Sequence, residues 1–575
     1  MNYTSSIQSP GLMALPPWRS RTLFALLLLG LCALLARAFY LQGIHNGFLQ
    51  RKGDARYSRI VEISAHRGMI SDRYGDPLAI STPVESVWAN PQDVEATPEQ
   101  ARQLARLLDM NIEELKNRLS DSSRDFVYLK RQLPPEQAKR VAKLEIPGIS
   151  LQQEYRRYYP DGDVAAHLVG FTNIDDNGQE GMELALQNEL GGKDGSQRVI
   201  EDRRGHIVED VASLRAPKPG QDVQLSIDNR LQYLAFRAIK HAVEQHHAKT
   251  GSIVMLDAKT GEVLALANWP SYNPNSRDKA NPAIMRNRAI TDQYEPGSTM
   301  KPFTVAAALE AGTVTPQTVI DVDGGAMTLD GRTIHDSHRD DKLTVAQVLQ
   351  VSSNVGAAKM ALSLPPETFW RDLGEDGFGA STGSGFPGEA AGKLRDYKGW
   401  RDIDQATMAY GNGIAVSLLQ LARGYTIFAN DGVLLPVSLL KRDAVPAGNR
   451  IYPAKVAREV RSMLELVVQP GGTAPQAQIK GYRVAGKTGT AHKLQNGRYV
   501  NHYVASFIGM APASNPRLIE AVKVDDPTGE YYGGEVAGPV FSDVMGSALH
   551  LLNVPYDAPL DNVLTTHGEI VREDT

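Results

Sequence analysis

The chain has 575 residues, with 61 basic and 66 acidic side chains and a formal net charge of −5. Charges of both signs are interspersed, and no run of basic residues marks a surface that would bind nucleic acid. The length corresponds to about three to four average domains, although one large fold could account for much of it.

An apolar segment near the N-terminus predicts a membrane anchor. Residues 22–41 have the ~20-residue length that a bilayer span needs, and Arg37 interrupts them only near one end. Arg19 and Arg21 precede this segment without an acidic residue, which favours a cytoplasmic N-terminus. A cleaved signal peptide is the alternative, because the residues around Arg37 imitate a small-residue cleavage site, but arginine at its centre is unusual. We therefore expect a cytoplasmic tail over 1–21 and an uncleaved anchor over 22–41.

A linker divides the rest of the chain. Arg215-Ala-Pro-Lys-Pro-Gly220 has the proline and glycine content of a domain boundary. We expect an N-terminal module, the pedestal, over 45–217, a second domain over 220–558 and a C-terminal tail over 559–575. Hydrophobic periodicity and turn residues predict helices and extended segments on both sides of the linker. Helices are expected at 97–108, 135–144 and 231–243, and extended segments at 61–70, 81–88 and 222–227.

Three short polar signatures in the second domain indicate its chemistry. They are Ser298-Thr299-Met300-Lys301, Ser352-Ser353-Asn354 and Lys487-Thr488-Gly489-Thr490, in this order. A serine acyl-transfer enzyme that uses lysine instead of histidine to move protons needs these residue types. The order of the three carries the signal, because a single motif of this kind recurs elsewhere in the chain.

Further copies of the single motifs lie in the same chain. Ser276 and Lys279 form a second SxxK, the segment 271–273 a second SxN, and KTG recurs at 249–251 and 259–261. The triplet at 259–261 lies between two apolar runs and is typical of a hairpin turn, while the triplet at 249–251 leads into the first of them. The other two copies lie in a segment rich in proline and asparagine, which loops select. We interpret all four copies as loop or turn structure.

The surroundings of Ser298 differ from those of the copies. Residues 303–310 are strong helix formers and end at Ala311-Gly312, so Ser298 is expected in the first turn of a helix. The unpaired backbone N–H groups at a helix start favour a developing negative charge on a substrate oxygen. Lys301 follows three residues later and can share a face of the helix with the Ser298 hydroxyl. Ser298 is therefore the candidate nucleophile.

One loop carries residue types that bind metals. His335, Asp336 and His338 lie close to Asp340 and Asp341. The segment is a polar loop between two apolar segments, and no helical ligand pattern such as HExxH accompanies it. We interpret it as a solvated loop and expect neither a metal nor another cofactor.

Ordered motifs outside the three signatures extend over nearly the whole chain. The pedestal contains Ala65-His-Arg-Gly-Met-Ile-Ser-Asp-Arg-Tyr-Gly75, Trp88-Ala-Asn-Pro91, Arg157-Tyr-Tyr-Pro160 and Asp202-Arg-Arg-Gly205. The second domain contains Tyr410-Gly-Asn-Gly413 and Tyr531-Tyr-Gly-Gly534. With these motifs the chain resembles the class B penicillin-binding proteins of the septal, cell-division type, which are peptidoglycan D,D-transpeptidases.

The resemblance implies a fold and a reaction. The fold is the α/β (α+β) penicillin-binding transpeptidase or serine β-lactamase-like fold, a central antiparallel sheet with helices on both faces, with a pedestal and one transmembrane helix. The donor substrate is the D-Ala-D-Ala end of a peptidoglycan stem peptide, and the acceptor is an amine on a neighbouring stem. The reaction cross-links stem peptides at the division septum, and β-lactams inhibit it covalently.

The resemblance also implies the roles of the catalytic residues. Ser298 attacks the carbonyl of the penultimate D-Ala to form an acyl-enzyme, and the last D-Ala leaves. Lys301 serves as the base, which requires burial and nearby cations to lower its pKa. Ser352 passes a proton to the leaving amine, and Asn354 holds Lys301 and the substrate amide. Lys487 supplies positive charge near the substrate carboxylate.

The residues after Lys487 are expected to bind the substrate. The hydroxyls of Thr488 and Thr490, on either side of Gly489, take its carboxylate. The backbone N–H groups of Ser298 and Thr490 form the oxyanion hole.

The resemblance places the protein in the cell inner membrane, with one span, a cytoplasmic N-terminus and a periplasmic catalytic domain. The implied partners are other division proteins, among them a polytopic glycan polymerase that could contact the transmembrane helix.

Three other classes of protein share some of these features. One class of serine β-lactamase needs a Glu-x-x-Leu-Asn deacylation base, and none lies between Ser352 and Lys487. A bifunctional penicillin-binding protein needs a glycosyltransferase domain, whose acidic signature is missing before residue 220. A catalytically idle division scaffold or β-lactam sensor has no need for all the polar residues of the three signatures together.

Charged residues in the pedestal motifs leave two interpretations open. They are Arg67, Asp72, Arg73, Arg157 and Glu183. Buried ion pairs that hold the shape of the module are favoured over a surface that binds a partner.

Overall fold

The structure is a computed structural model that describes residues 17–44, 58–201, 207–276, 281–495, 497–563 and 572. Some expectations lie outside the described residues. They are most of the predicted tails over 1–21 and 559–575, Lys279 of the second SxxK, and the motif at 202–205.

One helix of the described part of the chain is long and apolar enough to cross a membrane. It is α1 (Pro17–Phe39), which continues as a π-helical turn over Tyr40–Ile44, and the candidate span is Pro17–Gln42. The predicted anchor over 22–41 lies inside this span. No side chain of α1 is buried against protein, as a single helix surrounded by lipid requires.

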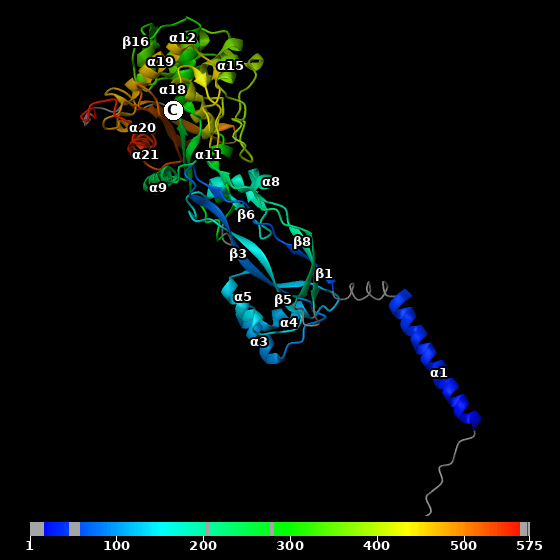
Figure 1. Ribbon diagram of the computed structural model, residues 1–575. Coiled ribbons are helices and arrows are strands. Elements are labelled where there is room, and N and C mark those ends of the chain that lie inside the picture. The colour runs from blue at the N-terminus through cyan, green and yellow to red at the C-terminus, as the bar shows by residue number, and fades with distance from the viewer. Residues whose placement is uncertain are drawn as a thin grey trace, which may run out of the picture. The chain divides into compact units, whose positions relative to one another are not determined.

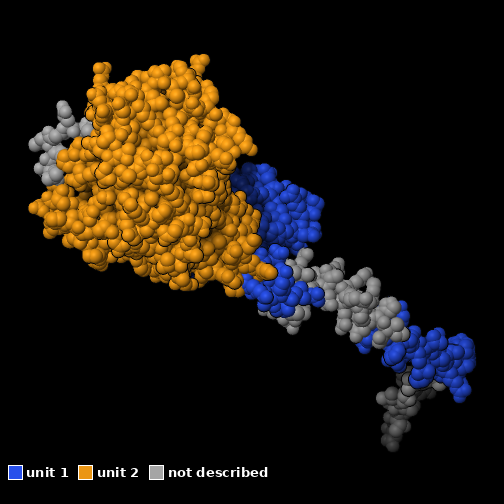
Figure 2. Space-filling model, turned by 90° about the horizontal axis from the view of Figure 1, so that it is seen from above, with its two compact units in different colours: residues 1–64, 84–154, 194–218 blue, residues 65–83, 155–193, 219–575 orange. Residues whose placement is uncertain are grey.

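The contacts within the chain divide it into two compact units, which Figure 2 colours separately. The first unit comprises 1–64, 84–154 and 194–218, and the second comprises 65–83, 155–193 and 219–575. The last division falls inside the linker at 215–220. Two segments of the predicted pedestal, 65–83 and 155–193, belong to the unit that holds the three signatures, because the chain enters that unit twice before the linker.

Apart from α1, the first unit combines short antiparallel strands with three helices in its described residues. β1 (Ser58–Ile63), β8 (Gly195–Glu201) and β9 (Ile207–Arg215) form a sheet in the order β1-β8-β9. β4 (Val127–Leu133) pairs with the end of β3 (Pro77–Ala89). Leucine and valine side chains of β3, β4 and the three helices share a small core. The helices are α3 (Pro98–Leu107), α4 (Ile112–Leu119) and α5 (Pro135–Ala142), and β5 spans Ile149–Tyr158.

The predicted elements of this region are mostly confirmed. The helix at 97–108 begins with a capping box, in which Thr97 and Gln100 satisfy each other's backbone N–H groups. The extended segment at 61–70 is wrong in its middle, since only its ends lie in β1 and in β2 (Ile70–Ser71). The strand predicted at 222–227 is reduced to β10 (Val223–Gln224), because its parallel partner β2 is itself two residues long.

A five-stranded antiparallel sheet forms the centre of the second unit, in the order β12-β11-β21-β20-β19. This arrangement confirms the predicted central antiparallel sheet. The KTG copy at 259–261 is the turn between the first two strands, as predicted, with Gly261 at φ 69°. β19 lies at one edge of the sheet, so none of the strands in the described residues pairs with one side of its backbone. The strands are β11 (Thr250–Asp257), β12 (Val263–Trp269), β19 (Ala485–Gln495), β20 (Arg498–Ala511) and β21 (Leu518–Asp525).

Helices cover both faces of this sheet, as predicted (Figure 1). On one face, α9 (Asn229–Gln245) lies against Gly251 and α21 (Gly538–Leu551) lies against Gly509. On the other face, Gly489 of β19 lies against the turn that contains Thr299. The sheet therefore has a structural side and a side that carries the first signature.

The smaller elements of the second unit connect these layers. Its other helices are α6 (Ala166–Val169), α7 (Gly181–Ala185), α8 (Gln187–Leu190), α10 (Pro282–Met285), α11 (Arg288–Thr291), α12 (Lys301–Glu310), α13 (Val345–Gln350), α14 (Asn354–Leu362), α15 (Pro366–Glu375), α16 (Asp402–Met408), α17 (Leu418–Gly424), α18 (Thr426–Ala429), α19 (Ala454–Leu464) and α20 (Gly533–Val536). Its other strands are β6 (Phe171–Thr172), β7 (Gly178–Glu180), β13 (Val319–Asp321), β14 (Ala326–Leu329), β15 (Arg332–His335), β16 (Lys342–Thr344), β17 (Val433–Leu434) and β18 (Asn449–Arg450).

Three charged residues of the pedestal motifs, Arg67, Arg157 and Glu183, form buried ion pairs, as the favoured interpretation predicts, whereas Asp72 accepts from backbone N–H groups. The two oxygens of the fully buried Glu183 carboxylate accept from Arg67 Nε at 2.7 Å and from Arg157 Nε at 2.6 Å. Arg67 also donates to the carbonyl oxygens of Asp176 and Glu183. Because a buried charge is costly without partners, the pairs tie three separate chain segments together.

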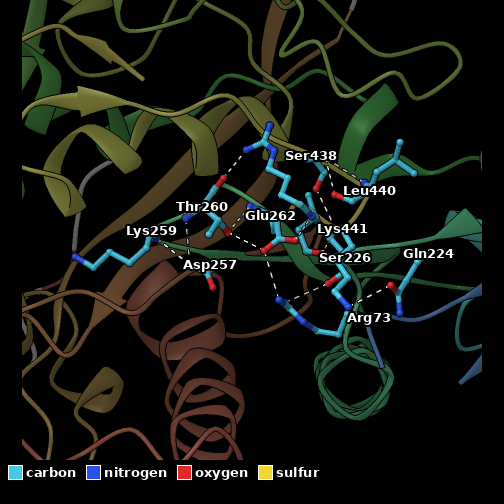
Figure 3. A network of polar contacts seen from close by, with 12 residues as sticks. Arg73, Gln224, Ser226, Asp257, Lys259, Thr260, Glu262, Ser438, Leu440 and Lys441 are labelled. Atoms are coloured by element: carbon cyan, nitrogen blue, oxygen red, sulfur yellow. Dashed lines mark hydrogen bonds and ion pairs between the residues drawn. The ribbon is translucent and has the colours of Figure 1, made fainter. Parts of the chain in front are cut away.

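Arg73 joins a second polar network, beside the β11–β12 turn (Figure 3). Its guanidinium lies 3.4 Å from Glu262 Oε2, and Thr260 Oγ1 donates to the same oxygen at 2.9 Å. The other oxygen of Glu262 accepts from the backbone N–H of Arg442 at 2.8 Å. Asp257 caps the turn by accepting from the backbone N–H of Thr260 at 3.2 Å. The motif that begins at Ala65 thus helps to hold one end of the central sheet.

The buried carboxyl of Glu520 leads to a prediction of how the stability of the protein depends on pH. Glu520 is fully buried in β21, neither carboxyl oxygen has a hydrogen-bond partner among the described residues, and burial raises its pKa well above 4.5. A carboxyl whose pKa is raised by folding costs stability as pH rises from its unfolded to its folded pKa. We expect Glu520→Gln, which cannot ionise, to gain stability over the wild type above pH 4.5, by up to about 1.4 kcal/mol per pH unit.

The measurement is the free energy of unfolding of the purified protein in detergent between pH 4 and pH 8. Glu244→Gln, at an exposed position of α9, is the matched control and should follow the wild-type curve. Parallel curves for wild type and Glu520→Gln would contradict the prediction.

Candidate active site

Ser298 lies in a 3-10 turn, Gly297–Met300, that leads directly into α12. The sequence predicted the first turn of the helix, and the structure shows a tighter turn just before the α-helix begins. Pro302 follows at the second helical position, where no N–H group is needed. The helix ends at Glu310, as predicted. Ser298 is 5% exposed, so the candidate nucleophile is at the floor of the site.

The amine of Lys301 joins the first two signatures. Lys301 is fully buried, and its Nζ lies 2.9 Å from Ser298 Oγ and 3.0 Å from Ser352 Oγ. It also donates to the carbonyl oxygen of Ser352. An amine between two serine hydroxyls can take a proton from one of them and deliver it towards the other.

Ser352 reaches this position through an unusual backbone conformation. It follows α13 and has φ 65°, in the left-handed region that costs a non-glycine residue about 1–3 kcal/mol. Ser353 is the N-cap of α14 and accepts from Gly356 N at 2.9 Å. Asn354 begins the helix, and its side-chain amide donates to the carbonyl oxygen of His335 at 3.0 Å. The roles of Asn354 towards Lys301 and substrate stay predictions.

The third signature lies on the edge strand β19. Lys487 is fully buried and donates to Thr488 Oγ1 at 3.0 Å, and the Thr488 hydroxyl is 2.7 Å from the hydroxyl of Thr473. Thr490 Oγ1 accepts from Gly533 N at 2.9 Å. Both threonines predicted to bind a carboxylate thus also have protein partners. Thr473 was missed, since nothing in its sequence context distinguishes it from a turn residue.

Two glycines let neighbouring segments approach the nucleophile closely. A Cβ on Gly489 would lie 2.5 Å from Ser506 Oγ and 2.9 Å from a methyl carbon of Thr299. A Cβ on Gly411, which has φ 87°, would lie 2.2 Å from the carbonyl oxygen of Gly297. The short distance of the turn at Ser298 from both segments therefore depends on the absence of side chains at these glycines.

A pocket of about 120 Å³ lies above the nucleophile. Three of the predicted site residues line it, Ser298, Asn354 and Thr490. The sequence interpretation missed the rest of the wall as site residues, although Tyr410 and Asn412 belong to a quoted motif. The lining is Gly297, Ser298, Asn354, Tyr410, Asn412, Thr490, Ala491, His492 and Tyr499.

Glu295 supports one side of this pocket. Its carboxylate accepts from the Tyr499 hydroxyl at 2.9 Å and from Gly413 N at 2.8 Å. Burial raises the pKa of this carboxyl. Three residues before the nucleophile, Glu295 thus ties the pocket-lining tyrosine to the segment that presents Ser298.

The loop with metal-ligand residue types has a different task from the one predicted. In the part of the chain that the structure describes, no three His, Cys, Asp or Glu side chains are grouped to hold a metal ion. The interpretation as a solvated loop is wrong for Asp336, because its carboxylate accepts a hydrogen bond from the Ser353 hydroxyl at 2.6 Å. The β14–β15 hairpin brings it there, which no local pattern indicates.

Comparison with known proteins identifies the family. Residues 251–546 match the model of the penicillin binding protein transpeptidase domain, and residues 62–225 match that of the penicillin-binding protein dimerisation domain. The chain belongs to the penicillin-binding protein transpeptidases. The family and the fold inferred from the motifs are therefore confirmed.

Individual relatives agree with this assignment. The probable peptidoglycan D,D-transpeptidase PenA of Neisseria gonorrhoeae is 45% identical over 547 residues, 94% of this chain and 94% of the relative. The peptidoglycan D,D-transpeptidase FtsI of Escherichia coli K12 is 42% identical over 549 residues, 94% and 93% of the two chains. The apo transpeptidase domain of Burkholderia pseudomallei penicillin-binding protein 3 is 49% identical, with a TM-score of 0.54, and covers 58% of this chain and 98% of its own.

The close approach of Gly411 to Gly297 yields a prediction. Gly411→Ala should slow acylation by a β-lactam at least tenfold, because the new methyl group displaces the turn that carries Ser298 and an error of about 1 Å can cost 100-fold. The measurement is the rate at which a fluorescent penicillin labels the purified protein. Gly413→Ala is the control: Gly413 has φ 80°, but a Cβ there would meet only an arginine side chain, at 3.3 Å. Equal rates for the two variants would contradict the prediction.

Proposed function

We propose that the protein is a peptidoglycan D,D-transpeptidase that cross-links stem peptides at the division septum through an acyl-enzyme on Ser298. The observation that carries the proposal is the buried amine of Lys301 between the hydroxyls of Ser298 and Ser352. The family and the names of the relatives support the same reaction class. A catalytically idle scaffold or sensor is disfavoured, since it would not need this assembled proton path.

Acylation uses the first two signatures. Ser298 gives its proton to the Lys301 amine and attacks the carbonyl of the penultimate D-Ala, so that the carbonyl oxygen becomes an oxyanion. The backbone N–H groups of Ser298 and Thr490 stabilise this oxyanion, each at about 3 kcal/mol. The peptide C–N bond then breaks, the proton reaches the leaving nitrogen through Ser352, and D-Ala departs.

The second half of the reaction returns the enzyme to its starting state. The acceptor amine attacks the ester carbonyl, its proton passes to the same lysine and serine, and Ser298 is released as the new amide forms. Lys487 attracts the donor carboxylate, and the hydroxyls of Thr488 and Thr490 bind it. Gly489 keeps the strand close enough to the nucleophile for both contacts.

We expect a β-lactam, which carries a carboxylate like that of the donor peptide, to acylate Ser298 and to stay attached. A purified sample should gain the mass of one penicillin, stable for hours, and Ser298→Ala should gain none. The measurement is intact mass over time, with Ser276→Ala, in the second SxxK, as the matched control that still forms the adduct. Rapid loss of the adduct would indicate a β-lactamase, and no adduct on the wild type would revive the idle scaffold.

The apolar helix supports a location in the cell inner membrane, with the N-terminus cytoplasmic and the catalytic domain periplasmic. We infer that the partners are other division proteins, including a polytopic glycan polymerase that contacts α1. Replacement of residues 23–36 by an unrelated apolar helix should reduce septal localisation severalfold in cells while leaving penicillin labelling of the purified protein unchanged. Fluorescence microscopy of tagged protein measures the first, and unchanged localisation would exclude a specific role for this helix.

A further inference from the structure

Asp336 makes contacts that the reaction described above does not use. It follows β15 directly, and its own N–H donates to the carbonyl oxygen of Gly325 at 2.8 Å, which fixes it to the base of the β14–β15 hairpin. Its carboxylate reaches the second signature, which begins 16 residues later in the chain. There Oδ2 accepts from the Ser353 hydroxyl at 2.6 Å, and Oδ1 accepts from Asn354 N at 2.5 Å and Val355 N at 3.0 Å.

These contacts complete the start of α14. The first N–H groups of a helix have no partner inside it, and carboxylates bind them well. Here Asp336 takes the first two, and the Ser353 hydroxyl takes that of Gly356 at 2.9 Å. The Ser353 hydroxyl therefore accepts from the helix and donates its own proton to Asp336. Its orientation is fully determined.

The backbone conformation of Ser352 depends on these contacts of Asp336 with Ser353, Asn354 and Val355, which together form a clamp. Ser352 is adjacent to the clamped segment and has φ 65°, a conformation that persists only where its surroundings hold it. In this conformation its carbonyl oxygen and its hydroxyl both contact Lys301 Nζ. The same loop also holds Asn354 from the other side, since the Asn354 amide donates to the carbonyl oxygen of His335 at 3.0 Å.

The geometry points to Asp336 as a positioning residue of the acylation step, which acts by holding the turn at Ser352 in the conformation that contacts the Lys301 amine. The inference rests on the proposed function. Asp336 does not itself line the pocket, and it contacts the pocket-lining Asn354 only at the backbone N–H. It touches none of the reacting atoms, so it acts through the turn at Ser352 and not on the substrate directly.

Two substitutions separate hydrogen bonding from charge. Asp336→Ala removes all three contacts. Asp336→Asn removes the charge but retains an oxygen for Asn354 N and Val355 N, and its amide can donate to the Ser353 hydroxyl, which has a second lone pair for this purpose. A positioning role through geometry therefore predicts that asparagine rescues most of the rate that alanine loses.

The experiment measures acylation of the full-length protein in detergent by a fluorescent penicillin, with the rate constant of the chemical step separated from the initial dissociation constant. Asp336→Ala should slow the chemical step about 100-fold and leave the dissociation constant within about twofold, because the misplaced hydroxyl matters for proton transfer. Asp336→Asn should stay within about tenfold of wild type. If Asp336→Ala does not fold, Ser353→Ala, which removes one of the three contacts, should show an intermediate loss in the same step.

Asp228→Ala is the matched control. Asp228 is a buried aspartate that caps another helix of the same unit, α9, by accepting from Arg230 N at 3.1 Å. Its loss should lower thermal stability without a change in the chemical step of folded protein.

The outcomes distinguish this inference from the function on which it rests. A wild type that forms no adduct overturns the proposed function. A wild type that acylates, with Asp336→Ala equally fast, overturns the inference alone. An equal loss in the alanine and asparagine variants also overturns it, because it would assign the effect to charge and not to the position of Ser352.

Discussion

A lysine amine without access to water must find acceptors for its protons inside the protein, and the site is built around this requirement. The Nζ of Lys301 meets two oxygens of Ser352 and the hydroxyl of Ser298. Unmet, such a buried polar group would cost several kcal/mol. The contacts that stabilise the buried amine are the same contacts that align the proposed nucleophile, Ser298, with the proposed base and with Ser352. Folding and catalysis therefore place the same demand on this residue.

Much of the surrounding structure keeps backbones close together at this point. The turn at Ser298 is approached by β19 through Gly489 and by the segment after α16 through Gly411, each at a distance that a side chain would prevent. Because β19 lies at the edge of the sheet, none of the described strands pairs with the backbone groups on its outer side, near Ser298. Strain at Ser352 is accepted in the same place. Backbone strain and close approach thus concentrate where the chemistry requires exact positions.

Buried charges elsewhere in the second unit follow two patterns. The carboxylate of Glu183 is paired with two arginines and joins three chain segments, so its burial supports the fold. The carboxyl of Glu520 has no such partners among the described residues, and its burial raises its pKa, which disfavours the charged form. The two carboxyls differ in the hydrogen-bond donors around them. The arginines that converge on Glu183 offer several donors, whereas the described strand neighbours of Glu520 on the sheet face offer none.

The sequence by itself determined the chemistry, the order of the three signatures, the main helices and the apolar anchor, because these depend on residue types and short periods along the chain. The proximity of Ser298 and Lys301 could be predicted from the sequence, because residues three positions apart lie on the same face of a helix. Only the tertiary structure decided that Ser352, 51 residues from Lys301, shares its amine, that Asp336 clamps the turn beside Ser352, and that Thr473 meets Thr488. These contacts join segments that are distant in the chain, and nothing in the local sequence of Asp336 or Thr473 distinguishes them from ordinary loop residues.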